Sequence, residues 1–203
     1  DHDVPALLPT ENGVLAVWST HGGDWKTYYR TIEPDGSLSE LLTFSPESRD
    51  GYGVTYSNMF QKPNEIINFY RGFGWDPNAM VSKDGGATWT DEGQLLGGPG
   101  RPYVRYADDK QGNIHFIATE QHPRNFDNSI YHGKLVGAQV QSSFGEVKGE
   151  LGSSPPPPES LTKIFQGDTN NVAWCNAIEI GDNGHPVIAY SVQKDSAGMK
   201  VGT

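Results

Sequence analysis

The sequence predicts an all-β protein, a β-propeller of four-stranded antiparallel blades, from three observations. Leading turns recur near residues 13, 64, 113 and 184, and a second turn follows each of the first three after about 20 residues. A period near 50 residues with two hairpins per period is typical of propeller blades. The chain has 25 glycines, 14 prolines and only 35% hydrophobic residues, which suits short strands joined by turns. No stretch shows the 3.6-residue period of a helix, so we expect few helices.

Each leading turn is followed by a run rich in strand-forming residues. The third interval between turns is the longest and contains the proline run 155–158, which predicts an extended surface insertion around residues 150–160. We therefore expect a single partial propeller domain over 1–203, with about four blades of a longer propeller and the first and last incomplete. A small, complete four-bladed ring is the alternative. The predicted strands after the leading turns are 14–19, 66–71, 114–119 and 186–191.

Residues 82–89, with the sequence SKDGGATW, predict a tight hairpin. Asp84 can accept hydrogen bonds from backbone N–H groups further round the turn, and the following glycines supply positive φ angles. We expect Trp89 to cover the base of the turn. The spacing Ser-x-Asp-x-Gly-x-Thr-Trp resembles the Asp-box, or BNR, repeat, which is a structural element of sialidase-like propellers. An ordinary Asp-Gly hairpin is the alternative.

The composition excludes several function classes. The formal charge of −10 argues against nucleic acid and anionic membranes as partners, and no apolar run has the length of a membrane span. The same charge opposes an anionic substrate unless a local basic cluster overrides it. Cys175 is the only cysteine, so no disulfide forms within the chain, and we expect it to be buried or to bind zinc.

Polar residues recur where the predicted strands end, and the ligand sites of propellers lie at the ends of their strands. In chain order these residues are His21, Arg71, His122 and Tyr190. An exposed histidine or a salt-bridged arginine is the simpler explanation of each one alone. Further candidates precede the first two strands at comparable positions: His2 and Tyr56. A tyrosine packed between blades is the alternative for the second of these.

Several segments together are similar to the BNR-repeat family that includes the propeller-type ulvan lyases. Their order and spacing carry the resemblance, which extends from residue 1 to about residue 190. It implies a longer, seven-bladed propeller. The segments are His2–Ala6, Ser19–His21, Thr55–Asn58, Phe69–Arg71, Arg101–Tyr106, Ile114–Phe116, His122–Arg124 and His185–Val187.

The resemblance implies a secreted or periplasmic polysaccharide lyase that cleaves ulvan, a sulfated polymer of rhamnose and uronic acid, by β-elimination. This reaction needs a cation that neutralises the uronate carboxylate, a base for the C5 proton and an acid for the departing O4. By resemblance, Arg71 neutralises the carboxylate, His2 is the base, Tyr56 is the acid or both acid and base, and His21 contacts the uronate. Arg101 and Tyr103 match a substrate-binding segment. The elimination requires no cofactor.

Three further hypotheses stay open. Imidazole and thiolate suit zinc, so His122, Cys175 and His185 could belong to a structural zinc site. A sialidase-like hydrolase would use several arginines to hold a carboxylate, and Arg71, Arg101 and Arg105 are available. A non-catalytic carbohydrate-binding propeller would instead use aromatic side chains as stacking platforms; the candidates are Trp18, Trp25, Trp75 and Tyr103.

Overall fold

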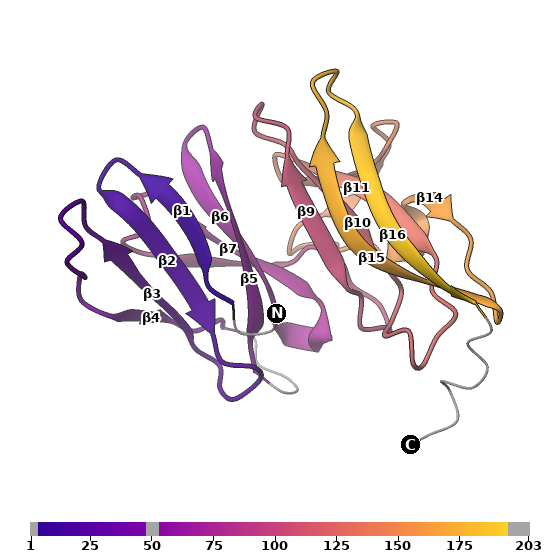
Figure 1. Cartoon of the computed structure of the whole chain (residues 1–203), viewed down its shortest axis with the longest axis horizontal. Coiled ribbons are helices and arrows are strands. Elements are labelled where there is room, and N and C mark those ends of the chain that lie inside the picture. The colour runs from indigo at the N-terminus through magenta and orange to yellow at the C-terminus, as the bar shows by residue number, and fades with distance from the viewer. Residues whose placement is uncertain (1–3, 48–52, 195–203) are drawn as a thin grey trace. The chain divides into compact units, whose positions relative to one another are not determined.

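The computed structural model describes residues 4–47 and 53–194, and its regular structure is almost entirely β-strand (Figure 1). Two short 3₁₀ turns, η1 (Phe73–Trp75) and η2 (Pro158–Ser160), are the only helical segments in these residues. None of the helical turns found there has the length or the apolar character needed to cross a membrane. The chain folds as two compact units that divide between Gln94 and Leu95.

The first unit holds two antiparallel sheets of four strands, each connected in sequence order. In the first sheet the strands are β1 (Ala6–Thr10), β2 (Gly13–Ser19), β3 (Thr27–Ile32) and β4 (Leu42–Phe44). In the second they are β5 (Thr55–Lys62), β6 (Glu65–Arg71), β7 (Pro77–Ser82) and β8 (Thr90–Gln94). Such four-stranded meanders are the blades of a propeller. The fold class is confirmed, but the first sheet is already complete, contrary to expectation.

The core of this unit explains which strands are most apolar. Every residue of β6 from Ile66 to Arg71 is buried, because β6 has a partner strand on each side and covered faces. Side chains from both sheets meet in one hydrophobic cluster that includes Leu15, Val17, Ile66 and Met80. The packing of β2 against the second sheet fixes the ends of these strands relative to one another.

The hairpin predicted at residues 82–89 is present between β7 and β8, but the seven residues 83–89 connect the strands, so the turn is longer than the tight one expected. The carboxylate of Asp84 accepts hydrogen bonds from the Ser82 hydroxyl at 2.8 Å and the Thr88 backbone N–H at 2.9 Å. These bonds lower the pKa of Asp84, with the Thr88 hydroxyl as the largest cause. Trp89 packs edge-on against Tyr29, with ring centroids 6.1 Å apart. The motif therefore fastens the second sheet to the first and is structural.

The second unit holds a six-stranded sheet and a two-stranded sheet (Figure 1). The first has the order β13-β12-β11-β10-β9, and β14 also pairs with β11. Its strands are β9 (Val104–Asp108), β10 (Ile114–Ala118), β11 (Ile130–Val136), β12 (Gln139–Ser142), β13 (Val147–Glu150) and β14 (Thr162–Phe165). The two-stranded sheet pairs β15 (Asn171–Ile180) with β16 (Pro186–Lys194).

The long third interval of the sequence is an insertion with structure of its own. β12 pairs with the second half of β11, and β14 pairs with the first half, so the β12–β13 hairpin interrupts the blade between its third and fourth strands. The proline run is less exposed than expected, because Pro156 and Pro158 are buried. The carbonyl of Pro156 accepts a hydrogen bond from Gly97 N–H at 3.1 Å, which ties the run to the rest of the unit.

Candidate functional site

The first unit brings three of the predicted site residues to the same end of neighbouring strands. His21 is exposed in the loop that follows β2, Tyr56 lies at the start of β5, and Arg71 ends β6. Backbone hydrogen bonds join the His21 loop to the segment before Tyr56: Gly22 N–H donates to the Val54 carbonyl, and Val54 N–H donates to the Asp24 carbonyl. The fourth predicted residue, His2, lies outside the described residues.

Tyr56 has a backbone conformation that marks it out from other strand residues. Its φ angle is +62°, in the left-handed region that bulky residues rarely adopt. The cause is a β-bulge, since the pairing of β5 with β6 shifts between Thr55 and Asn58. Asn58 N–H instead donates to the side-chain oxygen of buried Asn68, at 2.9 Å. Backbone strain of this kind is typical of functional sites, where it aims a side chain that regular pairing would aim elsewhere.

The bulge places the Tyr56 ring under the guanidinium of Arg71. The Cζ atom of Arg71 lies 5.0 Å from the ring centroid, a cation–π contact. Arg71 is only 8% exposed, whereas Tyr56 is half-buried and reaches solvent. A fixed cation thus lies beside an accessible phenol, and the exposed His21 belongs to the adjoining loop. This group can bind an anion and transfer a proton.

Arg71 also faces a buried carboxyl group that sequence reasoning missed. Asp76 is the last residue of the five-residue turn from β6 to β7, is 2% exposed, and interacts electrostatically with Arg71. Burial raises the pKa of Asp76 to about 7, against the opposing effects of Arg71 and a hydrogen bond from Gln94. The sequence contained one indication of Asp76: this residue directly follows the Gly-Phe-Gly-Trp segment, which begins immediately after Arg71.

The second unit has an aromatic cluster at the end of the sheet where β9 begins and β10 ends. The rings of Tyr103 and Trp174 have centroids 4.5 Å apart, and His122 meets both edge-on, at 5.6 and 5.8 Å. The guanidinium of Arg101 lies 6.0 Å from the Tyr103 ring. All four side chains are half-buried, so part of each meets solvent. The predicted pair Arg101 and Tyr103 therefore lie together, and Trp174 is an addition that the sequence did not indicate.

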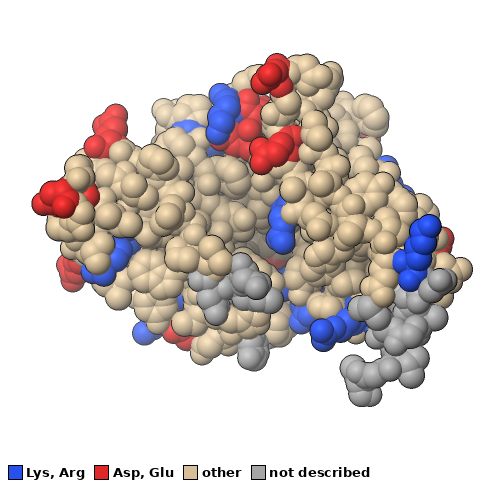
Figure 2. Space-filling model, viewed as in Figure 1, with Lys and Arg blue, Asp and Glu red and all other residues tan. Residues whose placement is uncertain are grey.

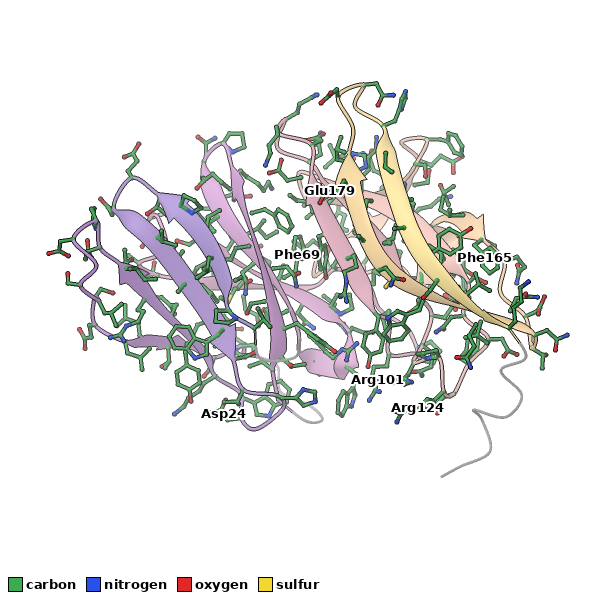
Figure 3. All side chains as sticks on the ribbon, in the orientation of Figure 1. Asp24, Phe69, Arg101, Arg124, Phe165 and Glu179 are labelled. Atoms are coloured by element: carbon green, nitrogen blue, oxygen red, sulfur yellow. The ribbon has the colours of Figure 1, made fainter. Side chains whose placement is uncertain are left out.

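Basic side chains gather around this cluster despite the net charge of −10. Figure 2 shows them in blue at the lower end of the second unit, and Figure 3 labels two of them there, Arg101 and Arg124. Glu179 lies at the opposite, upper end of the same unit (Figure 3). The backbone N–H of Arg124 donates to Nδ1 of His122 at 3.1 Å, so this residue lies directly beside the cluster. A local positive field of this kind can attract an anionic ligand to an acidic protein.

The hypothesis of a zinc site at His122, Cys175 and His185 finds no support in the geometry. Within residues 4–47 and 53–194, no three His, Cys, Asp or Glu side chains are grouped to hold a metal ion. His122 contacts Trp174, and the next residue, Cys175, points to the opposite face of β15 because strand side chains alternate. His185 lies in the turn beyond Ile180, roughly 16 Å along the strand from Cys175.

Cys175 is expected to resist thiol reagents in the native protein. Its side chain is fully buried, and its Sγ donates to the Tyr103 carbonyl at 3.3 Å. Labelling with a maleimide should therefore be slow in buffer and rapid in denaturant, as measured by mass spectrometry. A native protein labelled as fast as the denatured one would contradict this placement.

A second feature that the sequence did not indicate is a pair of histidines inside the six-stranded sheet. Nδ1 of His115 and Nε2 of His132 lie 3.1 Å apart, and Nδ1 of His132 lies 2.7 Å from the Ser143 hydroxyl. His132 is 2% exposed. Burial lowers the pKa of His132 to about 4, with smaller effects from His115 and Lys134. The pair links β10 and β11 to the inserted hairpin and requires that one of the two facing ring nitrogens carries no proton.

This pair contributes a loss of stability in mild acid, and Asp76, whose pKa burial raises to about 7, contributes in the opposite direction over the same pH range. The unfolded chain takes up a proton at His132 near pH 6.5 but the folded chain only near pH 4, so stability falls as the pH decreases between these values. The full effect is about 3 kcal/mol. Denaturant unfolding at pH 7, 6, 5 and 4 measures it. Between pH 7 and pH 4, His132→Gln should gain about 3 kcal/mol of stability relative to the wild type, because it lacks the His132 contribution. The control His185→Gln, at an exposed turn, should follow the wild type, and equal slopes in all three proteins would contradict the prediction.

Comparison with known proteins supplies a family and a fold. The sequence profile of a BNR repeat-containing family matches residues 1–201 of this chain. A solved ulvan lyase, described as a new polysaccharide lyase family, PL25, and bound to -[GlcA(1-4)Rha3S]-, aligns with a TM-score of 0.73 and 16% identity over 98% of this chain. A second structure of such an ulvan lyase aligns with a TM-score of 0.74 and 16% identity, over 99% of this chain and 53% of its own.

A sialidase of Trypanosoma rangeli in complex with the inhibitor DANA is similar at a TM-score of 0.50 and 14% identity, over 91% of this chain and 28% of its own. No curated protein matches the chain. The chain spans about half the length of the ulvan lyase structures, since it covers 53% of each. At these identities the solved structures establish the fold alone.

Proposed function

The chain belongs to the BNR repeat-containing family, and from this premise we propose that it is the part of a polysaccharide lyase that carries the reaction centre. The substrate is a sulfated, ulvan-like polysaccharide containing uronic acid, and the reaction is β-elimination. The observation that supports this most is the guanidinium of Arg71 fixed 5.0 Å above the ring of Tyr56 at a strained bulge. A cation and a phenol are two of the groups that the reaction needs, and here they are in contact.

Arg71 neutralises the uronate carboxylate. Charge-assisted hydrogen bonds from the guanidinium fork withdraw electron density from the carboxylate and so stabilise the carbanion that forms at C5. Burial strengthens this effect, because Arg71 is 8% exposed and a charge in a protein interior is screened less than one in water. The Tyr56 ring and the backbone of β6 hold the guanidinium in place, so little reorganisation is needed during the reaction.

The proton transfers then fall to Tyr56 and the histidines. A base takes the proton from C5, the electron pair of the C5–H bond forms the C4=C5 double bond, and the C4–O4 bond breaks. An acid gives a proton to the departing O4, which leaves as a hydroxyl group. The proton removed from C5 is thus matched by the proton added to O4. Tyr56 reaches solvent beside Arg71 and is proposed as the acid, or as both acid and base. His2 is proposed as the base, and the exposed His21 as a contact to the uronate.

The aromatic cluster of the second unit is proposed to bind further sugars of the polymer. Tyr103 and Trp174 present aromatic surface against which the apolar face of a sugar ring packs. Arg101 and Arg124 add positive charge at the same end of this unit, which suits carboxylate and sulfate groups (Figure 3). A polymer of this kind is too large to cross a membrane, so a secreted or periplasmic location is proposed as well.

Ultraviolet absorbance tests this function directly. The C4=C5 double bond of a lyase product absorbs in the ultraviolet, whereas the products of a hydrolase do not. The full-length protein is incubated with ulvan, with other uronate polymers and with a sialoside. Absorbance that grows only with uronate polymers supports the proposal. Release of sialic acid without absorbance would favour a sialidase-like hydrolase, and binding without any product would favour a carbohydrate-binding propeller.

A further inference from the structure

Asp76 has no task in the elimination chemistry, yet the turn between β6 and β7 is built around it. Its Oδ2 accepts a hydrogen bond from Gln94 Nε2 at 2.7 Å, and its backbone carbonyl accepts one from Asn78 Nδ2 at 2.8 Å. Gly74 covers the carboxyl group with a φ of +69°, and a Cβ at that position would lie 2.9 Å from Oδ2. Trp75 also has a positive φ, of +64°. Trp75 therefore bears backbone strain, whereas Gly74 supplies a positive φ that glycine adopts without strain, where the turn encloses this acidic side chain.

Within the described residues, one of the two carboxyl oxygens of Asp76 receives no hydrogen bond. Oδ1 of Asp76 is buried and has no hydrogen-bond partner among residues 4–47 and 53–194, and the residue is 2% exposed. A buried carboxylate oxygen without a donor is costly, so the charged form depends on the nearby cation, Arg71. The groups that face Asp76 from the surrounding strands are Arg71 of β6, Asn78 of β7 and Gln94 of β8. Arg71 alone among these three carries a charge.

We propose that Asp76 takes up a proton from solvent when a carboxylate binds Arg71, so that capture of the anionic substrate is linked to proton uptake. This rests on the proposed role of Arg71. In a weakly screened site, the single positive charge of Arg71 cannot balance both the Asp76 carboxylate and a bound substrate carboxylate. Asp76 can lose its charge by taking up a proton, and the substrate then stays bound to Arg71. Near neutral pH Asp76 already titrates, because its pKa is about 7, so the incoming carboxylate needs to shift it only upward.

The linkage makes substrate affinity depend on pH with a definite sign. Below pH 7 Asp76 is already protonated, and binding requires no further proton. Above pH 7 each bound carboxylate brings one proton with it, so Kd and KM increase by up to about tenfold per pH unit. Asp76→Asn keeps the shape of the side chain and an acceptor for Gln94 but cannot titrate. Its affinity should therefore remain constant over the same range. Asp76 acts through Arg71 and is a positioning residue.

Calorimetry measures the proton directly. Full-length protein carrying Tyr56→Phe, which should bind without turnover, is titrated at pH 7.5 with an ulvan oligosaccharide in two buffers of different ionisation enthalpy. We expect uptake of close to one proton per site. The double variant Tyr56→Phe, Asp76→Asn should take up almost none, whereas a matched control with Tyr56→Phe and Asp91→Asn, in β8 of the same sheet, should behave like the parent. Equal uptake in all three proteins, or no binding by the parent, would overturn the proposal.

A measurement on the parent alone covers the case in which the Asp76 variant does not fold. Infrared difference spectra should show a protonated carboxyl group that forms when the oligosaccharide binds; its absence would equally overturn the proposal. The lyase function is judged separately, from the ultraviolet product of the wild-type protein. Product formation without proton uptake would refute only the linkage through Asp76, whereas absence of product would refute the lyase function.

Discussion

Replacing Arg71 with alanine is expected to lower turnover of a uronate polymer by about a thousandfold or more. Without the guanidinium the carboxylate keeps its full charge, and the C5 proton is far too weakly acidic for a histidine or tyrosine to remove. The change should reduce kcat and kcat/KM together, because the interaction strengthens as negative charge develops at C5. Initial rates of ultraviolet absorbance over a range of substrate concentrations measure both quantities.

Two further variants separate charge from geometry at this position. Arg71→Lys restores a positive charge without the planar fork, so we expect it to recover only part of the activity. Arg30→Ala is the matched control, since Arg30 lies in β3 of the same unit and donates to the Ser39 carbonyl at 2.7 Å. It should keep wild-type kinetics. If Arg71→Ala retained a tenth of the activity or more, the carboxylate would have to be neutralised by another group.

The fold was predictable because its signals are local. The turn pairs and strand-forming runs recur in each blade, and all four predicted strands are present as β2, β6, β10 and β16. Asp84 and Thr88 form the expected hairpin, since that motif contains all of its own hydrogen-bond partners. The inserted β12–β13 hairpin was not predicted, because its place in the blade depends on how β11 divides its pairing between two distant strands.

Part of the site was predictable as well, because the position of a strand end is also a local signal in the sequence. Strand ends at equivalent places in successive blades indicated His21 and Arg71, but not the bulge that gives Tyr56 its conformation, which depends on the register between β5 and β6. Asp76 and Trp174 were missed because their importance comes from what they contact rather than from a motif. Tyr190 lies within β16 and packs on Phe165, so it does not share the position of the other candidates.

Replacing Tyr56 with phenylalanine is expected to abolish turnover while substrate affinity changes little. The substitution removes one hydroxyl and keeps the ring on which Arg71 rests, so both the cation–π contact and the anion-binding position should survive. General acid–base catalysis by a single group contributes about a hundredfold to ten-thousandfold, and a residue with both roles should be near the upper end. The binding curve of the variant, measured by calorimetry, is then compared with the wild-type KM.

The combination of lost kcat and retained affinity is the signature of a group that acts in the transition state. Tyr190→Phe provides a matched control, because that ring lies within β16 and its contact is with Phe165; its kinetics should equal those of the wild type. If Tyr56→Phe were fully active, proton transfer would have to come from the histidines alone. If it instead lost affinity and kept kcat, the hydroxyl would be a binding contact. Because the bulge fixes the Tyr56 backbone whatever the side chain carries, a kinetic change in Tyr56→Phe reports on the hydroxyl rather than on a rearranged loop.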